Sequence, residues 1–214
     1  MKHVFESVIV PASVLIPIGA GLIKIVYKYP FAKPILIYLL FAGITDVVER
    51  ILGLRHINNL PLLHFYTIVE YLFILKFFQS FVSDFRVLRV IWILFILFPF
   101  LSVLDFIFIQ DIHEYNSYPR PIAALIVIGL CMYYFFNYTT QENKKPWVTM
   151  PINWIVTGLL IYFSSSLIYF AFLNLIAQQA SDNLYFIFGG IHATLVLLMY
   201  LMVAVGFLQI KNEG

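Results

Sequence analysis

The sequence predicts an all-α polytopic membrane protein, a seven-transmembrane-helix bundle with the N-terminus outside and the C-terminus in the cytoplasm. Charged residues make up only 11% of the 214 residues and hydrophobic residues 62%, with a mean hydropathy of +0.93. A soluble domain carries about 25% charged residues. The chain also divides into apolar runs near the ~20 residues that a helix needs to cross a bilayer. They cover residues 5–27, 34–54, 60–81, 88–109, 122–139, 153–175 and 184–210.

Turn or charge signals separate these runs and justify each boundary. In chain order the breaks read KYPFAKP, RHINN, SDFR, QDIHEYNSYPRP, QENKKPWVTMP and AQQASDN. Pro11 and Pro17 lie inside the first run and Pro99 inside the fourth, where each removes a backbone donor and tends to kink its helix. We therefore expect one domain, residues 1–214, of helices joined by short loops.

The positions of lysine and arginine predict the orientation, because cytoplasmic loops are enriched in both. With an odd number of spans, the loops after spans one, three and five share a side with the C-terminus. Of the 13 cations that side holds Lys24, Lys28, Lys33, Lys76, Arg86, Arg89, Lys144, Lys145 and Lys211, and the other holds Lys2, Arg50, Arg55 and Arg120. The larger set marks the cytoplasmic side.

Composition also restricts partners and compartment. The net charge of +2 and the scattered lysines do not indicate a nucleic-acid partner. Cys131 is the single cysteine, so neither an intrachain disulfide nor a thiolate metal cluster can form. Lys2 is followed closely by Glu6 without a convincing cleavage site, so we expect the first span to be retained. The expected location is the bacterial inner membrane, with the lipid bilayer as partner.

Glu70 is the most informative residue, because a carboxylate near the middle of a span is costly unless it is paired or faces water. Candidate partners are Asp46 and Arg50 in span two, which are four residues apart and share a helix face. His64 lies one to two turns before Glu70 on span three, and we expect the two on one arc. Alternatively, the Asp46–Arg50 pair only locks the hairpin of spans two and three.

Later spans add polar residues at similar depth. Span six contributes Tyr162, a run of three serines and Tyr169, and span seven contributes His192 about two turns below its outer end. Asp105 lies toward the outer end of span four. Most intramembrane polar groups therefore collect in the outer half, which predicts an outward-facing pocket. The predicted ligand-binding residues are Asp46, Arg50, His64, Glu70, Tyr169 and His192.

A metal or haem site is an alternative explanation of these charges. His64, Glu70 and His192 are ligand types that zinc or iron accepts, and bis-histidine haem between spans three and seven is conceivable. However, the sequence has neither two histidines four residues apart on a helix nor a metalloprotease motif. Phosphate loops, nucleophile elbows and kinase signatures are missing as well, which favours a protein without enzymatic activity. The sequence specifies no cofactor.

Two longer stretches carry a family resemblance. NNLPLLHFYTIVEYLF and NWIVTGLLIYFSSSLIYF, the latter followed by GIHATLVLLMY, are similar to an uncharacterised family of small seven-transmembrane bacterial membrane proteins. The matching positions are Asn58, Asn59, His64, Tyr66, Glu70 and His192. The resemblance covers about 60% of the chain. It implies a common seven-helix fold and no particular activity.

The sequence leaves several functions open. We expect a receptor-like or sensor-like protein that binds a small molecule or lipid in the outer-half pocket and passes its signal to a partner membrane or signalling protein. The first alternative is a small-solute or proton-coupled transporter or channel. It is favoured by similar loops before spans two and six, KYPFAKPILIY and KKPWVTMPINW, which suggest a repeat of three helices on either side of span four. The second is a metal-dependent intramembrane lipid hydrolase, and the third a structural subunit.

Overall fold

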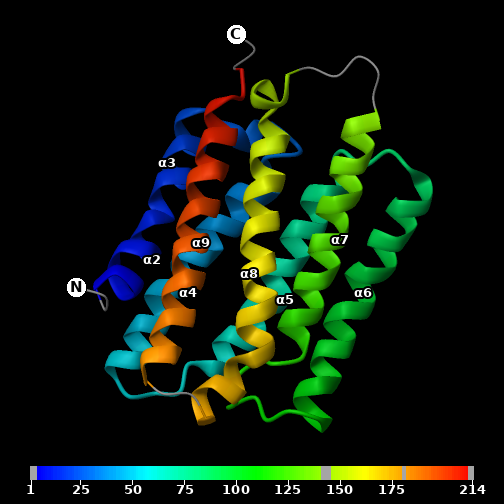
Figure 1. The fold of residues 1–214 in the computed structure, drawn as a ribbon. Coiled ribbons are helices and arrows are strands. Elements are labelled where there is room, and N and C mark those ends of the chain that lie inside the picture. Colours follow the sequence, from blue (N-terminus) through cyan, green and yellow to red (C-terminus); the bar gives the residue numbers. More distant parts are fainter. Residues whose placement is uncertain (1–3, 141–145, 180–181, 212–214) are drawn as a thin grey trace.

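Every regular element in the described residues is helical. The computed structural model describes residues 4–140, 146–179 and 182–211. Its long helices are α4 (Lys33–Leu54), α5 (Leu60–Gln79), α6 (Phe85–Phe108), α7 (Pro119–Thr140), α8 (Pro151–Gln179) and α9 (Asp182–Leu208) (Figure 1). The first apolar run forms η1 (Phe5–Ile9), α2 (Val10–Ser13) and α3 (Leu15–Ile23), and the short turns η2 (Val26–Lys28) and η3 (Trp147–Thr149) precede α4 and α8. Each predicted run therefore contains one helical segment.

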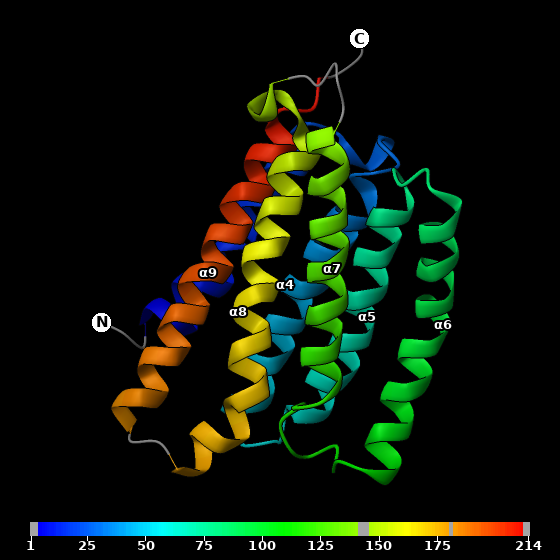
Figure 2. The same ribbon diagram turned by 45° about the vertical axis from the view of Figure 1, so that its right-hand side comes forward.

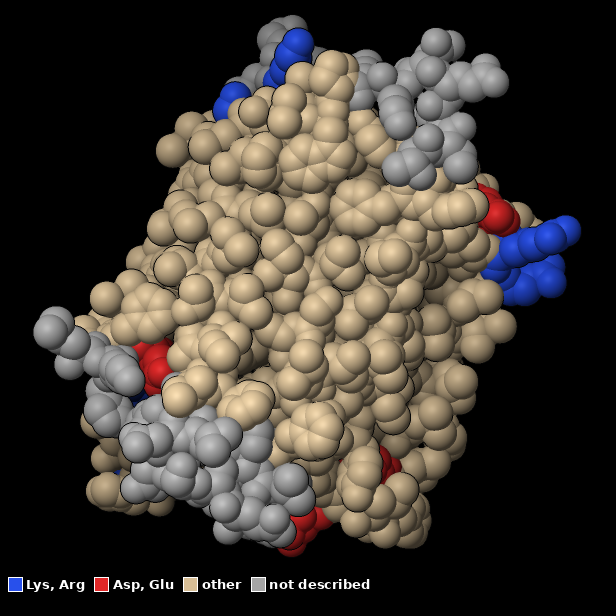
Figure 3. Space-filling view, in the orientation of Figure 1, with Lys and Arg blue, Asp and Glu red and all other residues tan. Residues whose placement is uncertain are grey.

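Six of these segments are long and apolar enough to cross a membrane. They are Phe5–Ile23, Leu60–Gln79, Phe85–Phe108, Pro119–Tyr138, Pro151–Phe172 and Ile187–Leu208. Helix α4 has 22 residues, but Asp46, Glu49 and Arg50 lower its apolar character. On the face in Figure 3, charged side chains lie toward the ends and edges and leave a broad uncharged area between them. The protein is thus a multi-pass integral membrane protein.

The first span is interrupted, as its prolines predict. A π-helical turn leads into α2, where Pro11 lacks a backbone donor, and α2 ends at Ser13, whose hydroxyl donates to the Val10 carbonyl. The next helix, α3, ends at Ile23, and Ile25 then takes a left-handed conformation with φ of 53°. The span therefore ends earlier than the predicted residue 27. In contrast, α6 continues through Pro99.

Helices of the first three spans and of the last three spans form a closed ring, and α6 lies outside it (Figures 1 and 2). Around the ring, α3 packs against α4, α4 against α5, α5 against α7, α7 against α8, α8 against α9, and α9 against α3. Helix α6 lies against α5 and α7 at the edge of the bundle. The first three spans and the last three thus supply consecutive ring members, and the fourth is peripheral.

The two ends of the bundle differ in chemistry. Toward the end that holds Ile210, the core is aromatic: Phe81 lies 5.0 Å from Phe77 and 5.5 Å from Tyr134 between ring centroids. Most buried polar side chains lie in the opposite half, as the sequence predicts. They include Thr45, His64, Thr67, Glu70, Ser102, Asp105, Gln110, Asn116, Arg120 and Ser166. Polar chemistry is therefore concentrated between the helices of one half.

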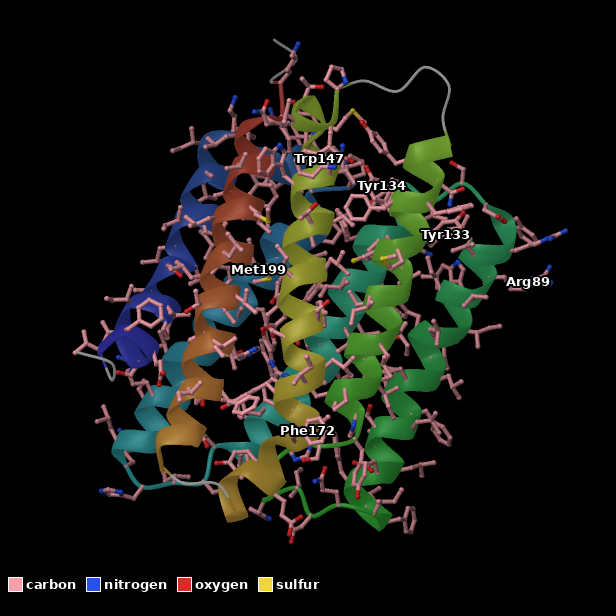
Figure 4. The ribbon with its side chains drawn as sticks, in the orientation of Figure 1. Arg89, Tyr133, Tyr134, Trp147, Phe172 and Met199 are labelled. Carbon is pink, nitrogen blue, oxygen red and sulfur yellow. The ribbon has the colours of Figure 1, made fainter. Side chains whose placement is uncertain are left out.

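The basic residues are also distributed unequally between the two ends of the bundle. Those at the Ile210 end are Lys24, Lys28, Lys33, Lys76, Arg86, Arg89 and Lys211, and the side chain of Arg89 points away from the bundle in Figure 4. Lys2, Lys144 and Lys145, which also enter the predicted charge bias, lie outside the described residues. Arg50 and Arg55 lie at the opposite end, and Arg120 is buried inside the bundle.

At the aromatic end, the fully buried Asn153 joins α7 to the start of α8. The Tyr134 hydroxyl donates to Asn153 Oδ1 over 2.5 Å, and Asn153 Nδ2 donates to the Trp147 carbonyl over 3.0 Å. Figure 4 shows Tyr134 and Trp147 near the same end of the bundle. The buried amide thus pairs with one donor and one acceptor, both partly buried.

We expect Asn153→Leu to lower the free energy of unfolding by about 1 kcal/mol, because it leaves the Tyr134 hydroxyl without its acceptor and removes one of the two donors to the Trp147 carbonyl, the other being the Met150 N–H. Reversible unfolding of purified protein in mixed micelles, followed by circular dichroism, measures the change. Tyr134→Phe in the Asn153→Leu background is the control, since removing the stranded hydroxyl should recover part of the loss. Equal stability of the wild type and Asn153→Leu would contradict the assigned role.

Candidate functional site

The centre of the polar half is Glu70 on α5, which is 2% exposed. Its Oε1 atom accepts hydrogen bonds from the hydroxyls of Tyr38 over 3.0 Å, Tyr66 over 3.2 Å and Tyr162 over 2.9 Å. Tyr66 lies one turn before Glu70 on α5, whereas Tyr38 comes from α4 and Tyr162 from α8. Three helices thus supply donors to one buried oxygen, which offsets the cost of placing a carboxylate at membrane depth.

Arg120 supplies the positive charge that accompanies Glu70. Its Nη2 atom donates to the Tyr162 hydroxyl over 2.9 Å and lies 4.0 Å from Glu70 Oε2. Its Cζ lies 3.9 Å from the ring centroid of Phe170, close enough for a cation–π interaction. The side chains of Arg120 and Glu70 are only 9% and 3% exposed. Because both are desolvated, removing one partner would leave an uncompensated buried charge.

The loop before α7 positions Arg120. Asn116 Nδ2 donates to Thr67 Oγ1 on α5 over 3.2 Å, and Asn116 Oδ1 accepts from the Arg120 backbone N–H over 3.3 Å. One buried amide therefore caps the start of α7 and ties it to α5. Pro119 is the first residue of α7, a position where its missing donor costs nothing. This local chemistry brings the Arg120 side chain to the level of Glu70.

The same loop is held together by further side chains. Gln110 Nε2 donates to the Tyr115 carbonyl over 2.6 Å, and Gln110 Oε1 accepts from the Ser117 backbone N–H over 3.2 Å. At the exposed turn, the backbone N–H and the imidazole of His113 both bind the Asp111 carboxylate, and these bonds lower the pKa of Asp111. The loop is therefore an ordered cover at the polar end of the bundle.

A cavity of about 490 Å³ opens beside the Glu70–Arg120 pair. This volume lies within the range of ~300–1,000 Å³ that is typical of small-molecule sites. Residues of α2, α4, α5, α7, α8 and α9 and of two connecting loops line it. Its polar and aromatic lining includes Asp46, Glu49, Asn59, Tyr66, Tyr115, Arg120, Tyr162, Tyr169, Phe170, His192 and Tyr200. Glu70 does not line the cavity, but its hydrogen-bond partners Tyr66 and Tyr162 do.

The α4 wall of the cavity carries two carboxylates. Glu49 Oε1 accepts from Asn59 Nδ2 over 3.0 Å. Among the described residues, Asp46 has no hydrogen-bond partner and no ion pair within 4.0 Å. The predicted pairing of Asp46 with Arg50 is not formed, because Arg50 is exposed at the end of α4. A long cationic side chain near a helix end reaches water readily. The acidic wall therefore has no ion pair within 4.0 Å to a cation of its own helix.

His192 belongs to the aromatic wall of the cavity. Its ring stacks on Tyr169 with centroids 4.8 Å apart and an interplanar angle of 7°, and Phe170 meets it edge-on at 5.5 Å. His192 Nδ1 lies 3.0 Å from Ser165 Oγ, whose own proton goes to the Tyr162 carbonyl over 2.8 Å. Because a carbonyl only accepts, Nδ1 of His192 must be the donor to Ser165. This assignment leaves Nε2 as an acceptor.

His64 lies on a different side of α5, against α6. Its Nε2 binds the Glu114 carbonyl over 2.9 Å, and its ring meets Phe106 edge-on at 4.5 Å. Nε2 therefore carries the proton, and Nδ1 is a buried acceptor without a partner among the described residues. The expectation that His64 and Glu70 share one arc is not met, because six residues of helix separate their directions by about 120°.

The six predicted ligand-binding residues thus fall into three groups. Asp46, Tyr169 and His192 line one cavity together. Glu70 lies behind the cavity lining, where its Oε1 atom accepts hydrogen bonds from two of the lining tyrosines. Arg50 and His64 do not line the cavity: Arg50 is exposed, and His64 faces α6 and the loop before α7. Three of the six residues therefore line the cavity, two point elsewhere, and the role of all six in ligand binding stays a prediction.

The metal candidates do not form a cluster. Within the described ranges, no group of three or more histidine, cysteine, aspartate or glutamate side chains is arranged to hold an ion. His64 and His192 make separate contacts, with α6 and α8 respectively, so they do not face each other across a haem. Glu70 uses its Oε1 atom for three tyrosine hydroxyls.

Sequence reasoning missed Arg120 and Tyr38. Arg120 was counted with the loop cations, although the proline on either side of it, in PRP, is a helix-start signal that would have placed it inside the span. Tyr38 gave no comparable signal, because a tyrosine in an apolar run is as common at a lipid interface as at a hydrogen-bonded site. Both are found only when the packing of α4, α5, α7 and α8 is known.

Comparison with known proteins does not add to this geometry. No family model, no curated protein and no solved structure matches the chain significantly. The resemblance to a bacterial seven-span family through Asn58, His64 and Glu70 therefore stays a prediction. Function has to be inferred from the cavity itself.

Proposed function

We propose that the protein is a receptor-like or sensor-like membrane protein that binds a small molecule in the cavity between α2, α4, α5, α7, α8 and α9. The observation that carries the proposal is the cavity of about 490 Å³ with charged groups on two walls, Asp46 and Glu49 on one and Arg120 on another. Charged groups at membrane depth are costly and are usually kept for a function. The buried Glu70–Arg120 pair fixes the shape of the site.

The proposal includes seven spans with the N-terminus outside and the bacterial inner membrane as location. Helix α4 then crosses the bilayer as the seventh span, with its carboxylates turned to the cavity. The described lysines and arginines at the Ile210 end support a cytoplasmic position for that end. The cavity, lined by the loop residues Asn58 and Tyr115 of the opposite end, then opens outward.

We expect Val196→Trp to abolish ligand binding, because Val196 lines the cavity and an indole would occupy its space. Native mass spectrometry of protein released from native membranes measures the co-purified small molecule. Leu198→Trp, two residues along α9 and directed to lipid, is the matched control and should retain it. A small molecule that persists in Val196→Trp, or that is missing from the wild type as well, would contradict the proposal.

Transport is the second candidate, and the ring arrangement favours it. Three consecutive spans on each side of a peripheral α6 make the plan expected of a three-plus-one-plus-three transporter. The same Val196→Trp variant separates the two functions in proteoliposomes loaded with the co-purified molecule. Flux that the variant blocks would favour transport, whereas binding without flux would favour the receptor.

A further inference from the structure

We propose that the ligand of the cavity is a small zwitterion, with its ammonium group held by Asp46 and Glu49 and its carboxylate or phosphate held by Arg120. This inference rests on the proposed function and specifies its ligand. Two walls of the cavity carry opposite charges, and both have hydrogen-bonding capacity that the protein does not use. A ligand that fills both must itself carry both charges.

The positive wall has unused donors. A guanidinium has five N–H donors, and the structure records one side-chain hydrogen bond for Arg120, from Nη2 to Tyr162. Its Nε atom is buried without a partner among the described residues. Glu70 Oε2 is 4.0 Å from Nη2, which is too long for a hydrogen bond. Carboxylates and phosphates bind guanidinium groups in a bidentate manner, so an anionic ligand group would satisfy these donors.

The negative wall has unused acceptors. Asp46 and Glu49 lie one turn apart on α4 and both line the cavity, and of their four oxygens only Glu49 Oε1 has a recorded partner, Asn59. Arg50 is exposed and forms no ion pair within 4.0 Å with either carboxylate. An ammonium group brings three donors. Tyr66 and Tyr200 lie in the same lining.

Ligands with a single charge fit less well. A simple amine would satisfy the α4 carboxylates but leave the Arg120 donors unfilled. A simple acid would satisfy Arg120 but would bring a further negative charge into a cavity that two carboxylates already line. Two sources supply the required chemistry, namely free amino-acid-like molecules and the headgroup of phosphatidylethanolamine. Both join an ammonium to an anion over a short linker.

The experiment varies the charge on the ligand, so that the fold is not disturbed. Protein in phosphatidylglycerol nanodiscs is titrated with leucine and phenylalanine, with the matching amines that lack the carboxylate, and with the matching acids that lack the ammonium. In a second arm, native mass spectrometry compares retention of phosphatidylethanolamine and phosphatidylglycerol. We expect a zwitterion from at least one source to bind about tenfold or more tightly than its singly charged analogue, since the analogue leaves the charged group on one wall without a hydrogen-bonding partner.

Variants then assign the two ends. Asp46→Asn combined with Glu49→Gln should remove the preference for the zwitterion over the acid, and Arg120→Lys should weaken the preference over the amine while keeping the charge that Glu70 requires. Thermal unfolding confirms that each variant is folded. Equal binding of amine and zwitterion, or binding of no zwitterion from either source, would overturn this inference. A neutral molecule that co-purifies with the wild type and is displaced by Val196→Trp would also overturn this inference. The proposed binding function would still hold in that case.

Discussion

Glu70→Gln is expected to lower the free energy of unfolding by about 3 kcal/mol, because it leaves Arg120 as a buried charge without a counter-ion. The two side chains are 3% and 9% exposed, so water screens their charges only weakly. Glutamine keeps the shape of the side chain and still accepts a hydrogen bond from the Tyr162 hydroxyl. The loss of unfolding free energy therefore reports mainly on the charge. The measurement is reversible unfolding in mixed micelles at several denaturant concentrations.

The double variant Glu70→Gln/Arg120→Gln is the decisive control. Replacing both members of a buried ion pair is often nearly neutral, so the second substitution should recover most of the stability. The coupling free energy from this cycle isolates the pair. A loss below about 0.5 kcal/mol in Glu70→Gln, with no recovery in the double variant, would show that Asp46 or Glu49 compensates Arg120 in place of Glu70.

Much of the architecture could be predicted from the sequence, because membrane spans are set by length and apolar composition alone. Each predicted run contains a helical segment, and the discrepancies are local. The first span ends at Ile23 because Ile25 turns the chain, and α7 begins at Pro119, three residues before the predicted run. Apolar composition alone identifies α4 less clearly than the other spans, because the charged residues that line the cavity also lower the hydropathy of this helix.

The polar site was predictable only in part. That Glu70 needs partners follows from electrostatics at membrane depth, but which helices supply them depends on packing. Arg50 was chosen from the sequence because it shares a helix face with Asp46, whereas Arg120 pairs with Glu70 in space because Asn116 ties the start of α7 to Thr67. Spacing on one helix predicts faces, and it places Tyr66 one turn from Glu70, but the six-residue spacing of His64 was wrongly taken as one shared arc. It does not predict that α7 lies beside α5.

Gly206→Ala is expected to be the most damaging small change at the α8–α9 interface. A Cβ atom at Gly206 would lie 2.8 Å from Ile155 Cγ1 and 2.9 Å from the Pro151 carbonyl oxygen. The Pro151 oxygen belongs to the backbone, so the clash is relieved only if the two helices separate. Small residues allow helices to approach closely in a membrane. We expect a loss of about 2–3 kcal/mol in unfolding free energy and a lower yield of monodisperse protein.

Gly189→Ala on the same helix is the matched control, because a Cβ there meets no described atom within 4 Å. It replaces glycine by a better helix former, and should be neutral or slightly stabilising. Unfolding in mixed micelles compares the two variants directly, and size-exclusion chromatography reports their yield. Because α8 and α9 carry the aromatic wall of the cavity, separating them should also weaken retention of the co-purified molecule. Equal stability of Gly206→Ala and Gly189→Ala would mean that α8 and α9 are not packed as closely as the structure places them.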